Sequence, residues 1–164
     1  MKIIGIDSGA KGALVELDIN EKAARWIKLP YREDGILDHH KIKREFNLNE
    51  AHYIYIEKVG PNKIFGLSNF TFGANFRDVH TMIGQDYPYT LVSPRSWQRR
   101  FNGNVEEKTA KLKTKSSFRK MNPSFGKIVA NQHEGLIDAF FIAYFAGIDN
   151  NVVMPRDWNF QEVL

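Results

Sequence analysis

The chain has 164 residues, of which 43% are hydrophobic and 26% charged, with a net charge of +4, and this composition is typical of a single globular domain. The lack of cysteine excludes a disulfide scaffold and a thiolate metal site. Because the sequence contains no run of about 18 apolar residues and no signal-peptide pattern, we expect a cytoplasmic protein without membrane contact.

Alternating apolar residues at the start of the chain predict three short strands. Residues 2–7 form a buried strand that ends at an acid, Asp7, and a tight turn follows over residues 8–12. Residues 13–18 and 24–29 continue the alternation on either side of a hairpin turn at 20–22. These strands predict an antiparallel meander.

Helices and strands alternate in the next part of the chain. We expect a polar helix over residues 38–47, a strand over 52–57 that ends at Glu57, a helix over 68–83 and a strand over 89–92. The predicted fold class is therefore α/β, with a mixed five-stranded sheet, three antiparallel strands and then two parallel ones, flanked by helices.

Helices dominate the rest of the predicted structure. Pro94 begins a helical turn, a basic helix covers residues 106–121, and a strongly apolar helix covers residues 131–147. We expect one domain over residues 1–149 and an irregular C-terminal tail over residues 150–164.

The basic residues are concentrated in one segment. Ten of them lie between Arg95 and Lys127 against two acids, Glu106 and Glu107, so this segment carries +8 and the remainder of the chain −4. Such a concentration favours a polyanionic partner, and a solvated helix face is the alternative. Lys108, Lys111 and Lys115 would step along one helix face and track phosphates, and Lys115 is the candidate for stabilising charge at the scissile phosphate.

Four acids are candidates for chemistry. Asp7 and Glu57 end strands, where α/β folds place their sites, and Asp138 precedes eight uncharged residues in the apolar helix. Glu134 lies four residues before Asp138, on the same helix face. Several carboxylates without cysteine suit Mg²⁺ or Mn²⁺, and two such ions can activate water for phosphodiester hydrolysis.

Each acid also has a structural interpretation. Asp7 could belong to a plain turn, Glu57 could end a capped strand, Glu134 could favour the helix dipole, and Asp138 could bind a backbone amide. The combination of all of them is the reason to prefer a metal site.

Several motifs resemble RuvC-type Holliday junction resolvases. Residues 3–9 with Gly12-Ala13-Leu14 resemble the opening strand and turn of that family, residues 55–59 its second acidic strand, and residues 133–143 its closing helix. Residues 93–97 and the basic residues 108–120 sit where related bacterial and phage sequences carry similar elements.

The resemblance implies a ribonuclease H-like fold, Mg²⁺-dependent cleavage of four-way DNA junctions in recombination and repair, and a homodimer. It places Asp7, Glu57 and Asp138 in the catalytic cluster. We expect two Mg²⁺ ions per site, which Mn²⁺ can replace. The residues expected to contact DNA are Arg95, Arg99, Arg100, Lys108, Lys111, Lys115, Arg119 and Phe65.

The sequence departs from the family pattern at two positions. Gly135 stands where the family commonly has a helix carboxylate, so Glu134 or His133 must substitute for it. On a helix Glu134 lies about 40° from Asp138 and His133 about 140° from it, which favours Glu134. Gly60 replaces an aromatic residue after the strand glutamate, and Phe65 is a candidate for its stacking role, or a core residue.

Three other classes of protein compete with this interpretation. A sugar kinase or actin-like ATPase opens with a similar loop but needs a second lobe, so we expect no nucleotide cofactor. An inactive nucleic-acid-binding module would not need the set of acids. A related nuclease that cuts flaps, forks or RNA hybrids remains open.

Overall fold

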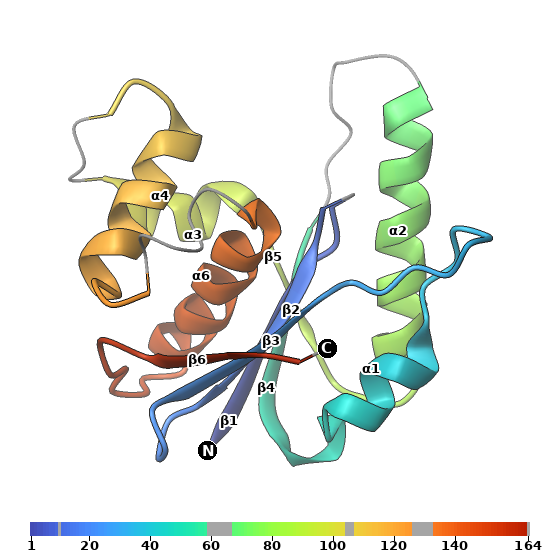
Figure 1. Cartoon of the computed structure of the whole chain (residues 1–164), viewed down its shortest axis with the longest axis horizontal. Coiled ribbons are helices and arrows are strands. Elements are labelled where there is room, and N and C mark those ends of the chain that lie inside the picture. The colour runs from blue at the N-terminus through green and yellow to red at the C-terminus, as the bar shows by residue number, and fades with distance from the viewer. Residues whose placement is uncertain (10, 59–66, 104–106, 126–132, 164) are drawn as a thin grey trace.

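The computed structural model describes residues 1–9, 11–58, 67–103, 107–125 and 133–163. The strands are β1 (Lys2–Asp7), β2 (Ala13–Asp18), β3 (Ala23–Lys28), β4 (Ala51–Glu57), β5 (Thr90–Val92) and β6 (Asn159–Glu162). The helices are α1 (His39–Glu45), the short 3-10 helix η1 (Leu48–Glu50), α2 (Leu67–Gly84), α3 (Pro94–Asn102), α4 (Ala110–Met121) and α6 (Glu134–Asp149). The strands form one sheet in the order β5-β4-β1-β2-β3-β6, with α1 and α2 on one face and α3, α4 and α6 on the other (Figure 1).

The predicted meander and its parallel extension are confirmed. Strand β2 pairs antiparallel with both β1 and β3, while β4 pairs parallel with β1 and β5 pairs parallel with β4. The α/β class and the order of antiparallel and parallel strands thus agree with the alternation of apolar residues in the sequence.

The prediction of five strands and an irregular tail was wrong. Strand β6 lies in the predicted tail and pairs parallel with β3, with Phe160 opposite Ala24. The tail is held by tertiary contacts: Trp158 is buried, and its backbone N–H donates to Oδ1 of Asn122 at 3.2 Å. A four-residue edge strand that is mostly exposed has little apolar alternation, which is why the sequence pattern did not reveal it.

Each face of the sheet has its own apolar core. Ile4 and Ile6 of β1 pack toward α1 and α2, while Ile3 and Gly5 face α6. A Cβ atom at Gly5 would lie 2.3 Å from the carbonyl oxygen of Ala139 and from the backbone nitrogen of Ala143. Only glycine lets α6 approach β1 this closely, so α6 lies directly over the strand that ends at Asp7.

Two helices begin later than the sequence predicted. The basic helix α4 begins at Ala110 because the Thr109 side chain accepts a hydrogen bond from the backbone N–H of Leu112, so Lys108 precedes the helix. The apolar helix α6 begins at Glu134, with His133 at the N-cap position. In the described parts of the chain, no helix combines the length and the apolarity that crossing a bilayer requires.

Candidate active site

Two of the predicted acids leave the sheet side by side. Strands β1 and β4 are parallel with Ile6 opposite Ile56, so the next residues, Asp7 and Glu57, are neighbours at the carboxyl ends of the strands. Side chains alternate between the faces of a sheet, so Asp7 shares a face with Gly5, and Glu57 shares it with Tyr55. Both carboxylates therefore lie on the face that α6 covers.

Asp138 of α6 joins this pair from above the sheet. Burial, and then the charges of Asp7, Glu57 and Glu134, raise the pKa of Asp138 well above its usual range, and the nearby charge of Lys111 opposes this. Because α6 packs directly on β1, Asp138 lies on the same face of the sheet as Asp7 and Glu57, and the charges of these two acids act on it. A shared catalytic role for these three acids stays a prediction.

The pKa values of the Asp7 and Glu57 carboxyls also lie well above their ordinary values. Asp7 is only 9% exposed, and burial raises its pKa to about 6, although the backbone N–H of Gly9 donates to its Oδ1 at 2.9 Å. Burial and the charge of Asp7 raise the pKa of Glu57 to about 7. Such perturbed groups in one place are typical of functional sites.

The buried indole of Trp97 supports Glu57 and was not recognised in the sequence. Its Nε1–H donates to Oε1 of Glu57 at 2.9 Å, and its ring stacks on Phe141 of α6 at a centroid distance of 6.1 Å. Helix α3 begins two residues after β5, the strand paired with β4, and this connection brings Trp97 to the end of β4. The short connection between the predicted strand and the helical turn at Pro94 is the sequence feature that could have identified Trp97.

The structure explains why glycine occupies position 135. A Cβ atom there would lie 1.9 Å from the carbonyl oxygen of Lys11, so the first turn of α6 packs directly on the β1–β2 turn. No side chain fits at this position, and a carboxylate three residues before Asp138 is therefore excluded in this protein.

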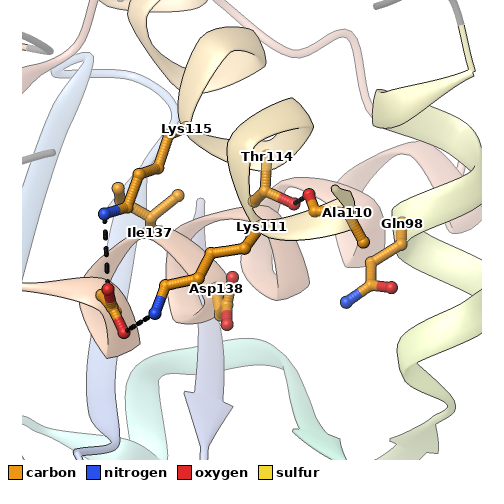
Figure 2. Close-up of a pocket in the computed structure, with 8 residues that line it drawn as sticks. Gln98, Ala110, Lys111, Thr114, Lys115, Ile137 and Asp138 are labelled. Atoms are coloured by element: carbon orange, nitrogen blue, oxygen red, sulfur yellow. Dashed lines mark hydrogen bonds and ion pairs between the residues drawn. The ribbon is translucent and has the colours of Figure 1, made fainter. Parts of the chain in front are cut away.

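Glu134 lies at the start of α6, and both of its carboxylate oxygens contact lysines of α4. The Nζ atom of Lys111 lies 2.6 Å from Oε2, and the Nζ atom of Lys115 lies 3.3 Å from Oε1 (Figure 2). The hydrogen bond from Lys111 is the main reason that the pKa of Glu134 lies below its ordinary value.

These residues line a cavity between α3, α4 and α6. It has a volume of about 300 Å³ and is bordered by Gln98, Ala110, Lys111, Thr114, Lys115, Glu134, Ile137 and Asp138. Lys111 and Lys115 extend from α4 toward α6, on the side where Asp138 lies (Figure 2). The cavity is thus lined both by two lysines, Lys111 and Lys115, and by Asp138, one of the three clustered acids.

His133 lies away from these carboxylates. Its ring packs on Trp26 of β3 at a centroid distance of 5.0 Å. The charged groups that affect its pKa are Lys28 and Glu162, and not the clustered acids. This position agrees with the helix angle that favoured Glu134 over His133.

The remaining predicted DNA contacts are exposed where they are described. Arg95, Arg99 and Arg100 lie on α3, Lys108 precedes α4, and Arg119 lies near the C-terminal end of α4. Helices α3 and α4 pack against each other over the same face of the sheet as α6 (Figure 1). Phe65, Glu106 and Lys127 lie outside the described residues.

The chemistry of the clustered acids fits a hard divalent cation. Asp7, Glu57 and Asp138 offer only oxygen donors, and Asp7 is buried while Glu57 and Asp138 are half-buried. Their charges repel one another, so a cation would relieve the repulsion. Within the described ranges, however, no three His, Cys, Asp or Glu side chains already lie in an arrangement that could hold a metal ion.

Comparison with known proteins identifies the fold. No protein-family model and no curated protein sequence matches the chain. A structure of T. thermophilus RuvC in complex with Holliday junction substrate is similar with a TM-score of 0.60 and 15% identity, over 94% of this chain and 99% of that one. A second Thermus thermophilus RuvC structure matches over the same shares, with a TM-score of 0.57 and 15% identity. The predicted ribonuclease H-like fold is thereby confirmed.

Proposed function

We propose that this protein is a RuvC-type nuclease that resolves four-way DNA junctions by metal-dependent phosphodiester hydrolysis. The observation that carries the proposal is the convergence of Asp7, Glu57 and Asp138 from β1, β4 and α6, next to Lys111 and Lys115 of the basic helix α4. Acids for a hard cation suit phosphodiester cleavage when one of them, Asp138, lines a cavity together with two lysines for a phosphate. The structural similarity to a RuvC bound to a Holliday junction supports the choice of substrate.

The three clustered acids would hold the metal. Mg²⁺, with Mn²⁺ as a substitute and two ions as the expected number, would lower the pKa of an attacking water and stabilise the leaving oxygen. Hydrogen bonds from the Gly9 N–H and the Trp97 indole orient the carboxylates of Asp7 and Glu57, which reduces the ordering that binding requires.

The lysines would bind the phosphodiester. Lys115 is the less exposed of the two, with 20% of its side chain accessible against 61% for Lys111. A partly desolvated ammonium acts more strongly on developing negative charge than an exposed one. We therefore assign Lys115 to the scissile phosphate and Lys111 to the phosphate backbone beside it.

The exposed cations of α3, of α4 and of the residues just before α4 would bind the arms of the DNA junction. Arg95, Arg99, Arg100, Lys108 and Arg119 are suited to phosphate contacts, which supply affinity but not sequence specificity. A homodimer would match the two-fold symmetry of a four-way junction and place one site on each of two strands, giving paired nicks.

The test is cleavage of a labelled four-way junction beside a matched linear duplex and a flap, with Mg²⁺ or with EDTA. We expect paired nicks near the branch point only with Mg²⁺, and far weaker cutting of the duplex. Preferred cutting of the flap would assign the chain to another branch of the same fold. Binding of the junction without any cleavage would indicate an inactive binding module.

A further inference from the structure

We propose that Glu134 is a positioning residue for Lys111 and Lys115 and not a ligand of the metal. This inference rests on the proposed nuclease function and assigns Glu134 a role other than the one expected from the sequence. Glu134 would hold the two ammonium groups at the cavity beside Asp138, where they meet the phosphodiester.

Glu134 contacts two lysines of α4 at once, and we call this arrangement of Glu134, Lys111 and Lys115 the clamp. Lys111 and Lys115 lie one helical turn apart on the same face of α4, so both can reach one group on a neighbouring helix. Each takes a different carboxylate oxygen, at 2.6 Å for Lys111 and 3.3 Å for Lys115 (Figure 2). A carboxylate that binds an ammonium through each oxygen has its charge neutralised and is a poor ligand for Mg²⁺ until those contacts break.

Both ends of the clamp are fixed to the rest of the protein. On the α6 side, Gly135 seats the first turn of the helix against the backbone of Lys11, and the helix N-terminus favours the negative charge of Glu134. On the α4 side, the buried Thr114 accepts a hydrogen bond from Nδ2 of Asn102 at 2.8 Å, and the Ser117 hydroxyl donates to the Phe101 carbonyl at 2.8 Å. These bonds join α4 to α3, so the lysines reach Glu134 from a helix that is itself bonded to its neighbour.

The charge balance of the clamp suits a phosphate. Two lysines against one glutamate leave one positive charge at the cavity, since Asp138, the other acid there, belongs to the three-carboxylate cluster. Without Glu134, the two ammonium groups would lose the carboxylate that each of them contacts and would repel each other.

The first experiment separates positioning from metal binding without using catalysis. Binding of Mn²⁺ to the full chain is measured by electron paramagnetic resonance for wild type, Glu134→Gln and Asp138→Asn. Positioning predicts that Glu134→Gln changes Mn²⁺ affinity by less than about twofold, while Asp138→Asn weakens it about tenfold or more. A loss for Glu134→Gln as large as that for Asp138→Asn would overturn the proposal.

The second experiment is a double-mutant cycle in single-turnover cleavage of the junction with Mg²⁺. Glu134→Gln should lower the maximal rate on the order of tenfold while junction affinity stays the same or tightens. In a Lys111→Ala, Lys115→Ala background the same change should have almost no further effect, because Glu134 acts only through these lysines. Additive losses would overturn the proposal.

A matched control is available at the other end of the sheet. Glu50 is also a glutamate paired with a lysine, Lys2, at 2.8 Å, and Glu50→Gln should alter neither Mn²⁺ affinity nor cleavage. If the wild type binds Mn²⁺ but leaves the junction intact, the proposed function fails, and the Mn²⁺ titration still decides whether Glu134 is a ligand.

Discussion

Acidic side chains lie largely out of solvent in two places in the protein, and the groups that contact them differ. Glu16 on β2 is only 2% exposed, and it lies 3.3 Å from Nη1 of Arg25 and 3.9 Å from Nζ of Lys2. The same Arg25 donates to the carbonyl of Glu45 at 2.9 Å and lies over the ring of Phe46. Asp7, in contrast, accepts a hydrogen bond from the uncharged Gly9 N–H and Glu57 accepts one from the uncharged Trp97 indole, and the pKa values of both carboxyls are raised.

We attribute the difference to a structural role for Glu16 and to the proposed metal site for Asp7 and Glu57. A buried charge that only supports the fold is paired with a cation, because leaving it unpaired is costly. Raised pKa values at three neighbouring carboxylates mean that their negative charges are unfavourable in the metal-free protein, and such groups are typical of functional sites. Glu134, with its two lysines, resembles Glu16 more than it resembles Asp7, which is a further reason to separate it from the metal site.

The largest expected effect is on catalysis. Asp7→Asn removes a proposed metal ligand and should lower junction cleavage by about a thousandfold or more, while junction affinity in Ca²⁺ stays close to wild type. Glu16→Gln, in folded protein, should keep cleavage within about threefold of wild type because Glu16 lies on the opposite face of the sheet, where its partner Arg25 lies over Phe46. Substantial activity in Asp7→Asn would show that the acid cluster is misassigned.

The next effect is on stability, where the two substitutions should have opposite signs. The pKa of Asp7 is about 6 in the folded protein, above its ordinary 3.8, so the folded state binds more protons than the unfolded state between these values. Stability should therefore fall as the pH rises through this window. Above it, in EDTA, Asp7→Asn should stabilise by about 1–3 kcal/mol, and Glu16→Gln should destabilise by a similar amount.

Urea unfolding on the acidic and alkaline sides of that window checks this prediction. The wild type should lose stability with rising pH, and the Asp7→Asn variant should lose less. Equal destabilisation by both substitutions would mean that the negative charge of Asp7 is balanced by its surroundings as well as that of Glu16 is.

The smallest expected effect concerns DNA affinity. Replacing Lys111 and Lys115 by Ala should reduce the slope of log affinity against log salt by about 2, through the loss of two phosphate contacts. Lys43→Ala is the control, because Lys43 belongs to α1 on the opposite face and pairs with Asp86 at 2.6 Å. An unchanged slope for the double variant, or an equal reduction for Lys43→Ala, would place the DNA on another surface.

The sequence was sufficient for the elements that local patterns determine. Alternating apolar residues predicted β1 to β4, and the position of Asp7 and Glu57 at strand ends predicted that they would meet. What it could not predict depends on contacts between distant segments, such as the pairing of β6 with β3 and the bond from Trp97 to Glu57. The lysine partners of Glu134 belong to the same group, because the relation between α4 and α6 is set by packing and not by spacing.

The claim that the uncompensated acids form a divalent metal site can be tested most directly by crystallography with Mn²⁺. Anomalous diffraction from crystals grown above the pKa of Glu57 should locate Mn²⁺ about 2.1 Å from carboxylate oxygens of Asp7, Glu57 and Asp138, with Glu134 still bound to Lys111 and Lys115. Crystals in saturating Mn²⁺ with no ion at these three carboxylates would contradict the account.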